Sequence, residues 1–244
     1  SGGYAITSAA TANSLMSLAM RRDAVLKRLR DAEARYGRPG GSVGLVAASK
    51  DQPPQRIREL AGLGQRAFGE NYLQEACRKM DACADLDLDW HFIGALQGNK
   101  AADVARRFDW VHTVASASIA RRLSAARPAQ RGPLDVCIQV NVDADPAKSG
   151  LAPAAAETLA GEIAALPRLR LRGLMTVPAR GADFEAQRRP FRALHTMLQA
   201  LNSRGFALDT LSMGMSDDLE AAVAEGTTVV RVGTALFGLR PPRR

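Results

Sequence analysis

Apolar and polar residues alternate along the chain with two different periods. The first segment predicts one long helix, because apolar side chains recur at helical spacing in Leu15, Leu18, Val25, Leu26 and Leu29. Eight apolar runs then predict strands at Val43–Ala48, Arg66–Phe68, Trp90–Ile93, Trp110–His112, Leu134–Asn141, Leu169–Met175, Thr210–Ser212 and Val229–Val232. Amphipathic stretches between them predict helices at Pro54–Leu63, Tyr72–Asp81, Lys100–Arg107, Ser116–Ala126, Pro153–Leu166, Pro190–Ser203 and Asp217–Glu225.

The strict alternation of strands and helices predicts an α/β fold with parallel strands. Two neighbouring strands joined by a hairpin would show a turn signal such as Asn-Gly, and the chain has none between its apolar runs. Eight such units favour a single (β/α)8 barrel, the TIM barrel, with an additional helix at its N-terminus. An open doubly wound sheet is the alternative. It is disfavoured because Ser49–Pro53, rather than a Gly-x-Gly-x-x-Gly turn, follows the first strand.

The chain is expected to form one domain, because no linker-like change of composition divides it. We assign residues 1–13 to a disordered N-terminal tail or vector-derived remnant, 14–240 to the barrel and 241–244 to a basic C-terminal tail. No run approaches the roughly 20 apolar residues of a membrane helix. Ser1 to Ser14 also lacks the basic start and apolar block of a secretory signal, so a cytoplasmic location is expected.

Charge and cysteine content change this picture little. The net charge of +8 suggests an acidic partner such as nucleic acid. The arginines are spread along the whole chain, however, and only 5% of residues are aromatic, so a solvated arginine-rich surface is favoured. Cys77, Cys83 and Cys137 share no metal-ligand spacing and read as structural thiols, and no zinc site is expected.

In a barrel of this kind, functional groups lie at the carboxyl ends of the strands. Lys50 stands out there, since it is the only lysine that follows a fully apolar strand directly, and its amine is expected to point into the barrel mouth. A buried amine is shifted toward its neutral form, which can attack an aldehyde. The alternative for Lys50 is an ordinary loop lysine with a solvated amine.

The loops after the seventh and eighth strands resemble a phosphate-binding cradle. They supply Gly214, Ser216 at a helix start, and Gly233-Thr234, so that backbone N–H groups and hydroxyls can face an anion. Taken singly, each is an ordinary turn. Combined with Lys50 across the mouth, they predict a ligand with a phosphate at one end and a carbonyl at the other, and pyridoxal phosphate fits that description.

Three more residues are candidates for contact with the cofactor ring. Arg231 lies two residues before Gly233 on the same strand and face, where it can meet the ring nitrogen. A permanent cation there disfavours protonation of the nitrogen and weakens the ring as an electron sink. Asn71 can bond a ring substituent, and His91 is either near the ring or a satisfied core residue. His112 and His195 read as structural.

Several sequence blocks together resemble the pyridoxal phosphate homeostasis proteins. These blocks are Val46–Lys50, Phe68–Tyr72, Trp90–Gly94, Leu96–Lys100, Lys148–Gly150, Arg172–Met175, Leu211–Asp218 and Val230–Gly238. The resemblance implies a barrel like the N-terminal domain of alanine racemase, a fold-type III arrangement, spanning 14–240. It implies pyridoxal 5′-phosphate bound as a Schiff base on Lys50. It also implies Arg231 at the ring nitrogen, a phosphate site of Ser216, Gly233 and Thr234, and Met215 among the cofactor-binding residues.

The same resemblance implies a cofactor carrier rather than an enzyme with robust turnover. Alanine racemases carry a second, β-rich domain that contributes a catalytic tyrosine across a dimer interface, and no such segment follows the eighth strand here. We therefore expect a monomer that buffers pyridoxal phosphate or delivers it to apoenzymes by transient contact. No nucleic-acid or membrane partner is expected. An amino acid racemase of the same fold and a nucleic-acid binder are the alternatives.

Overall fold

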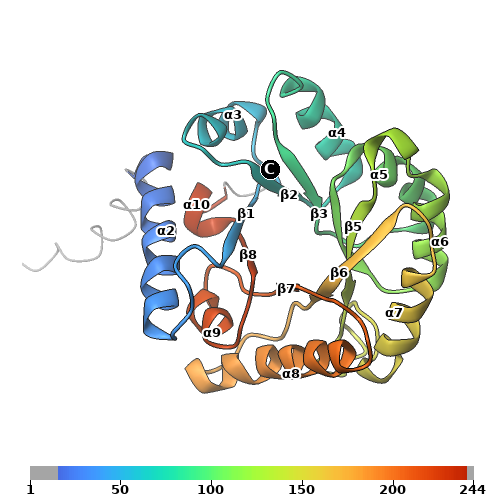
Figure 1. The fold of residues 1–244 in the computed structure, drawn as a ribbon. Coiled ribbons are helices and arrows are strands. Elements are labelled where there is room, and N and C mark those ends of the chain that lie inside the picture. The colour runs from blue at the N-terminus through green and yellow to red at the C-terminus, as the bar shows by residue number, and fades with distance from the viewer. Residues whose placement is uncertain (1–15, 241–244) are drawn as a thin grey trace, which may run out of the picture.

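The strands of the chain close into a ring that is surrounded by helices (Figure 1). The computed structural model describes residues 16–240, in which eight parallel strands pair in chain order and β1 also pairs with β8. The strands are β1 Gly44–Ala48, β2 Ala67–Glu70, β3 Asp89–Phe92, β4 Trp110–Val114, β5 Leu134–Gln139, β6 Leu169–Met175, β7 Thr210–Ser212 and β8 Val229–Val232. The predicted (β/α)8 barrel is confirmed, and the open sheet was the wrong alternative.

The helices lie close to their predicted places. The opening helix α2, Leu18–Arg35, begins where the Ser17 hydroxyl accepts a hydrogen bond from the Met20 amide at 3.1 Å. Leu15 of the predicted helix lies outside the described residues. The others are α3 Pro54–Gly62, α4 Leu73–Ala82, α5 Ala101–Arg107, α6 Ala117–Ala126, α7 Ala156–Ala164, α8 Phe184–Ser203, α9 Leu219–Ala224 and α10 Thr234–Phe237. Short 3-10 turns occupy Gly98–Lys100, Ala129–Arg131 and Pro153–Ala155.

The predicted start of one helix at Pro190 was wrong. Helix α8 begins at Phe184, because the Asp183 carboxylate accepts a hydrogen bond from the Ala186 amide at 2.8 Å and caps the first turn. Pro190 therefore lies inside the helix. Proline has no N–H to donate to the carbonyl of Ala186, yet the helix continues for three more turns, with its apolar face packed on the barrel.

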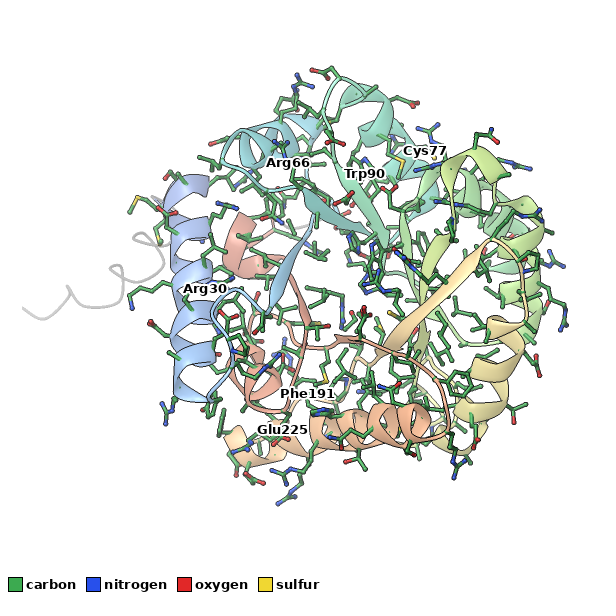
Figure 2. All side chains as sticks on the ribbon, viewed as in Figure 1. Arg30, Arg66, Cys77, Trp90, Phe191 and Glu225 are labelled. Carbon is green, nitrogen blue, oxygen red and sulfur yellow. The ribbon has the colours of Figure 1, made fainter. Side chains whose placement is uncertain are left out.

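The barrel core is apolar on the side of the helices and partly polar inside the ring. Trp90 and Phe191, marked in Figure 2, belong to the hydrophobic core, and Phe191 from α8 is fully buried. In strands β4, β7 and β8, alternation of side chains places His112, Ser212 and Arg231 on buried inward positions. Buried polar groups need hydrogen-bond partners, so these residues mark the part of the core where function is expected.

The closing pair of the barrel brings together segments that are far apart in the sequence. In the register of β1 with β8, Val46 pairs with Arg231 and Ala47 with Val232. The two strands are parallel, so the residues that follow them emerge at the same end of the barrel. Lys50, after β1, and Gly233, after β8, therefore belong to neighbouring segments.

Candidate functional site

A cavity of about 560 Å³ opens at the carboxyl ends of the strands. It includes seven of the eight predicted site residues, which are Lys50, Asn71, Met215, Ser216, Arg231, Gly233 and Thr234. These residues come from the segments that follow β1, β2, β7 and β8, or from β8 itself. The eighth, His91, is not among the lining residues. The volume suits a small organic molecule.

Lys50 places an amine at this cavity without a carboxylate partner. It lies two residues after β1 and is half-buried. Its Nζ lies 5.8 Å from the centre of the Tyr72 ring, and within residues 16–240 it makes no hydrogen bond or ion pair. An amine that is held near an aromatic ring but not neutralised by an acid is available to a ligand in the cavity.

Arg231 brings a second cation to the cavity from inside the barrel. Its side chain is only 5% exposed. Nη1 donates to Ser212 Oγ at 2.6 Å and Nη2 donates to the Thr176 carbonyl at 3.1 Å. Burial lowers the pKa of Arg231 to about 10, which still leaves the guanidinium charged at neutral pH. It forms no ion pair with any described residue; the charge of Asp218 acts to raise its pKa but lies beyond ion-pair distance.

A line of buried polar groups holds Arg231 from the other side. Ser212 Oγ lies 2.7 Å from His112 Nδ1, and His112 Nε2 lies 2.8 Å from His91 Nδ1. Because Arg231 already donates to Ser212, the hydroxyl hydrogen is left for His112 Nδ1, which puts the His112 proton on Nε2 and directs it to His91. Burial lowers the pKa of His91 to about 3 and that of His112 well below its usual range, so both rings are neutral.

His91 is buried in the barrel and does not line the cavity. Its ring stacks on Trp110, with 5.4 Å between ring centres, and it is 5% exposed. The structure places it at the end of the hydrogen-bonded line that reaches Arg231. The sequence offered no signal that would join His91 and His112, because the two lie on different strands.

The loops after β7 and β8 are shaped by glycine and joined by a serine. Gly214 adopts φ +103, and a Cβ there would lie 2.6 Å from Cβ of Ala222, so only glycine fits this turn. The turn delivers Ser216, whose Oγ accepts a hydrogen bond from the Ala235 amide at 3.2 Å. At Gly233 a Cβ would lie 3.1 Å from the Ala48 carbonyl, closer than side chains usually come. These contacts draw the two loops together along one wall of the cavity.

Residues that sequence analysis did not assign complete the lining. Arg180 and Arg240 stand at the rim, paired with Asp217 at 3.7 Å and with Asp51 at 3.4 Å. The remaining lining residues are Ala48, Ile93, Val177, Asp217 and Leu239. The lining thus carries four cations and a single carboxylate, which favours an anionic ligand. Arg180 follows no apolar run, so the pattern could not single it out.

Other site types find no support in residues 16–240. No group of three or more His, Cys, Asp or Glu residues is placed to hold a metal ion there. No helix in the same range has the length and apolar character needed to cross a membrane. Cys77, Cys83 and Cys137 are free thiols, and burial raises the pKa of Cys137 to about 12, which keeps that thiol unreactive.

Comparison with known proteins identifies close relatives over most of the chain. Residues 23–241 match the family model described as the alanine racemase N-terminal domain. A pyridoxal phosphate homeostasis protein of Pseudomonas aeruginosa is 52% identical over 216 residues, which is 88% of this chain and 93% of the relative. The protein of the same name from Escherichia coli K12 is 45% identical over 227 residues, 92% of this chain and 95% of the relative.

Solved structures show the same barrel. PipY of Synechococcus elongatus, described with PLP bound, is 36% identical with a TM-score of 0.81, covering 91% of this chain and all of PipY. Alanine racemase from Corynebacterium glutamicum is 19% identical with a TM-score of 0.66, covering 90% of this chain and 62% of the racemase. At that identity the likeness to the racemase concerns the fold alone.

Proposed function

This chain belongs to the family of pyridoxal phosphate homeostasis proteins, and from that premise we propose that its cavity binds pyridoxal 5′-phosphate as a Schiff base on Lys50. The observation that carries the proposal is the composition of one cavity, where an unpaired amine, a buried guanidinium without an ion pair and a serine-glycine loop meet. The names of the relatives and the PLP in PipY support the same ligand.

The wall formed by the β7 and β8 loops suits the phosphate. Ser216 and Thr234 offer hydroxyls, and the absence of a side chain at Gly233 lets an anion approach the backbone. The excess of cations around the cavity stabilises a phosphate dianion electrostatically. Met215 supplies an apolar contact beside these polar groups.

The opposite part of the cavity suits the ring and the aldehyde. The Lys50 amine would hold the aldehyde end of pyridoxal phosphate as a Schiff base, with release of one water molecule. Arg231, fixed by Ser212 and Thr176, would hold the ring at its nitrogen and disfavour protonation there. Asn71 bonds a ring substituent from the end of β2. When bound, pyridoxal phosphate supplies an electron-withdrawing ring, and a permanent cation at its nitrogen weakens that property.

These features favour holding the cofactor over using it. We infer that the chain buffers pyridoxal phosphate and passes it to apoenzymes by transient contact, as a cytoplasmic monomer without robust turnover. The homeostasis names of the relatives support this, and the likeness to alanine racemase reaches only the fold. Nucleic acid and membranes are not proposed as partners. Many surface arginines are paired with acids, as in Arg58–Asp85 and Arg170–Asp135, so the net charge does not form one free basic strip.

An absorbance spectrum before and after borohydride tests the proposal. We expect the purified chain mixed with pyridoxal phosphate to show a violet-region absorbance band that borohydride removes. Reduction leaves the cofactor covalently attached, and mass spectrometry should find it on Lys50. Lys50→Ala should show no reducible band. Lys27→Ala is the control, because Lys27 is exposed and paired only with Asp31.

Two results would refute the assignment. A reducible band that survives in Lys50→Ala would place the link on another lysine. Chiral analysis would also detect rapid conversion of L-alanine or L-serine to the other enantiomer. If Lys50→Ala abolished that conversion, the chain would be a racemase instead.

A further inference from the structure

A buried cluster of charged side chains lies behind Lys50. It consists of Glu70 at the end of β2 and of Glu75 and Lys79 on α4. Lys79 Nζ lies 2.6 Å from Glu70 Oε1 and 2.7 Å from Glu75 Oε1. Glu70 is 1% exposed and Lys79 4%. None of the three lines the cofactor cavity, and the proposed function does not use them.

The cluster forms hydrogen bonds with the residues on both sides of Lys50. Lys79 Nζ donates to the Ser49 carbonyl at 2.7 Å, and the Ser49 hydroxyl donates to Glu70 Oε2 at 3.2 Å. On the far side, the Asp51 amide donates to Glu75 Oε1 at 2.6 Å. The residues immediately before and after Lys50 are therefore both tied to the same group of charges.

The backbone at this point needs such support. Asp51 adopts φ +63, in the left-handed region that residues other than glycine adopt infrequently. The turn at Asp51 changes the direction of the chain directly after Lys50, which lines the cavity. The hydrogen bond from its amide to Glu75 favours this conformation of Asp51, which is the residue directly after Lys50.

Packing alone does not account for these charges. Burial of an ammonium and two carboxylates costs desolvation energy, and apolar residues of similar size often stabilise a protein more. The Lys79 ammonium donates to Glu75 and to the Ser49 carbonyl, and it forms an ion pair with Glu70. Glu75 and Lys79 are one helical turn apart, so α4 presents both to the ends of β1 and β2. A buried ion-pair network is therefore weak evidence for a stabilising role, and its hydrogen bonds to Ser49 and Asp51 point to a positioning role.

We propose that Glu70, Glu75 and Lys79 are positioning residues that lock the Ser49–Asp51 backbone so that the Lys50 amine meets the aldehyde of a ligand held by its phosphate. We name this group the Lys50 clamp. The proposal rests on the proposed function for the identity of the ligand, but its geometric content concerns the ligand-free chain. The clamp acts on the reaction of the amine and leaves the phosphate wall of the cavity unchanged.

The test uses Glu75→Ala, which frees the Asp51 amide, and Lys79→Met, which removes the central cation. Asp81→Ala is the matched control, since Asp81 is on the same helix and its partner is Arg107, at 2.6 Å. Hydrogen–deuterium exchange of the ligand-free proteins measures the hold on the Asp51 amide. Stopped-flow absorbance measures the rate at which Lys50 reacts with pyridoxal phosphate, and calorimetry measures affinity for inorganic phosphate.

We expect faster exchange at Asp51 and a reaction at Lys50 slowed about tenfold or more in both clamp variants, with unchanged phosphate affinity. The control should match the parent chain in all three measurements. Wild-type exchange and rate in Glu75→Ala would overturn the clamp, even if Lys79→Met failed to fold. An equal loss of phosphate affinity and reaction rate would also overturn it, because that pattern indicates general damage. Failure of the parent chain to form a reducible link would instead refute the proposed function, and exchange at Asp51 would still test the clamp.

Discussion

Two arginines in different parts of the barrel are almost equally buried, yet their surroundings differ. Arg127, 4% exposed, directly follows α6 and donates to the carbonyls of Ala105, Phe108 and Gly132 at 2.6–2.9 Å. Arg231, 5% exposed, has one hydroxyl and one carbonyl as partners and lines the cavity. Burial lowers the pKa of both side chains, and neither forms an ion pair with a described residue.

The difference separates a structural cation from a binding cation. Arg127 donates hydrogen bonds to three backbone carbonyls, and so it stabilises the fold. Arg231 has two partners among the described residues and lines the cation-rich cavity, whereas Arg127 does not line it. The burial of an arginine therefore does not show whether it is structural or binds a ligand. Its hydrogen-bond partners and its place relative to a cavity must be considered as well.

Arg127→Met should have the largest effect on folding. Loss of three donors leaves buried carbonyls without partners, and we expect the free energy of unfolding to fall by about 2–4 kcal/mol. Chemical denaturation of the ligand-free chain measures this change. Pyridoxal phosphate binding per folded molecule should stay at the parent value, and a specific loss of binding would remove the distinction between the two arginines.

Arg231→Met should show the reverse pattern. Affinity for pyridoxal phosphate, measured by fluorescence titration, is expected to fall about 10- to 100-fold with the loss of a charge-assisted contact. The free energy of unfolding of the ligand-free chain should change by less than about 1 kcal/mol, since removal of a desolvated charge offsets two lost hydrogen bonds. A large loss of stability with unchanged affinity would show that Arg231 is structural, like Arg127.

A smaller, pH-dependent effect should come from Glu70. Burial raises its pKa from 4.5 to about 7, against the lowering effect of Lys79, while the nearby Glu75 raises it further. The folded chain then holds this proton more tightly than the unfolded chain. The free energy of unfolding should therefore decrease as pH rises from about 4.5 to about 7 and level off above, by about 1–3 kcal/mol from this group.

Denaturation curves of the parent chain and Glu70→Gln across that range isolate the contribution of Glu70. The difference between the two proteins should vary with pH only in this window. A difference that is constant with pH would show that Glu70 titrates at an ordinary carboxyl pKa. The same comparison shows whether the Lys50 clamp carries a proton at neutral pH.

Much of the fold could be predicted from local patterns. The bounds of β6, β7 and β8 were predicted as the structure has them, because each is a short apolar run between turn residues. The error at α8 had a local cause as well. Pro190 is a strong sign of a helix start, whereas the capping role of Asp183 depends on a hydrogen bond that the pattern does not display.

The site was predictable only in part. Lys50, Arg231, Ser216 and Gly233 follow or lie in recognisable strands, and the structure gathers them at one cavity. His91 belongs to the line of hydrogen bonds toward Arg231 instead of the lining, since its direction depends on Trp110 and His112 from the next strand. Arg180 was missed because the loop after β6 has no periodicity to interpret.

The order of strands and helices, the barrel class and the lysine at the end of β1 were determined by the sequence itself. Hydrophobic periodicity and turn-forming residues act over a few positions, and both patterns are recognisable in this sequence. Only the folded structure decided which charges are paired. Closure of β1 against β8 and the docking of α4 bring together residues that are distant along the chain, and their desolvation depends on that assembly.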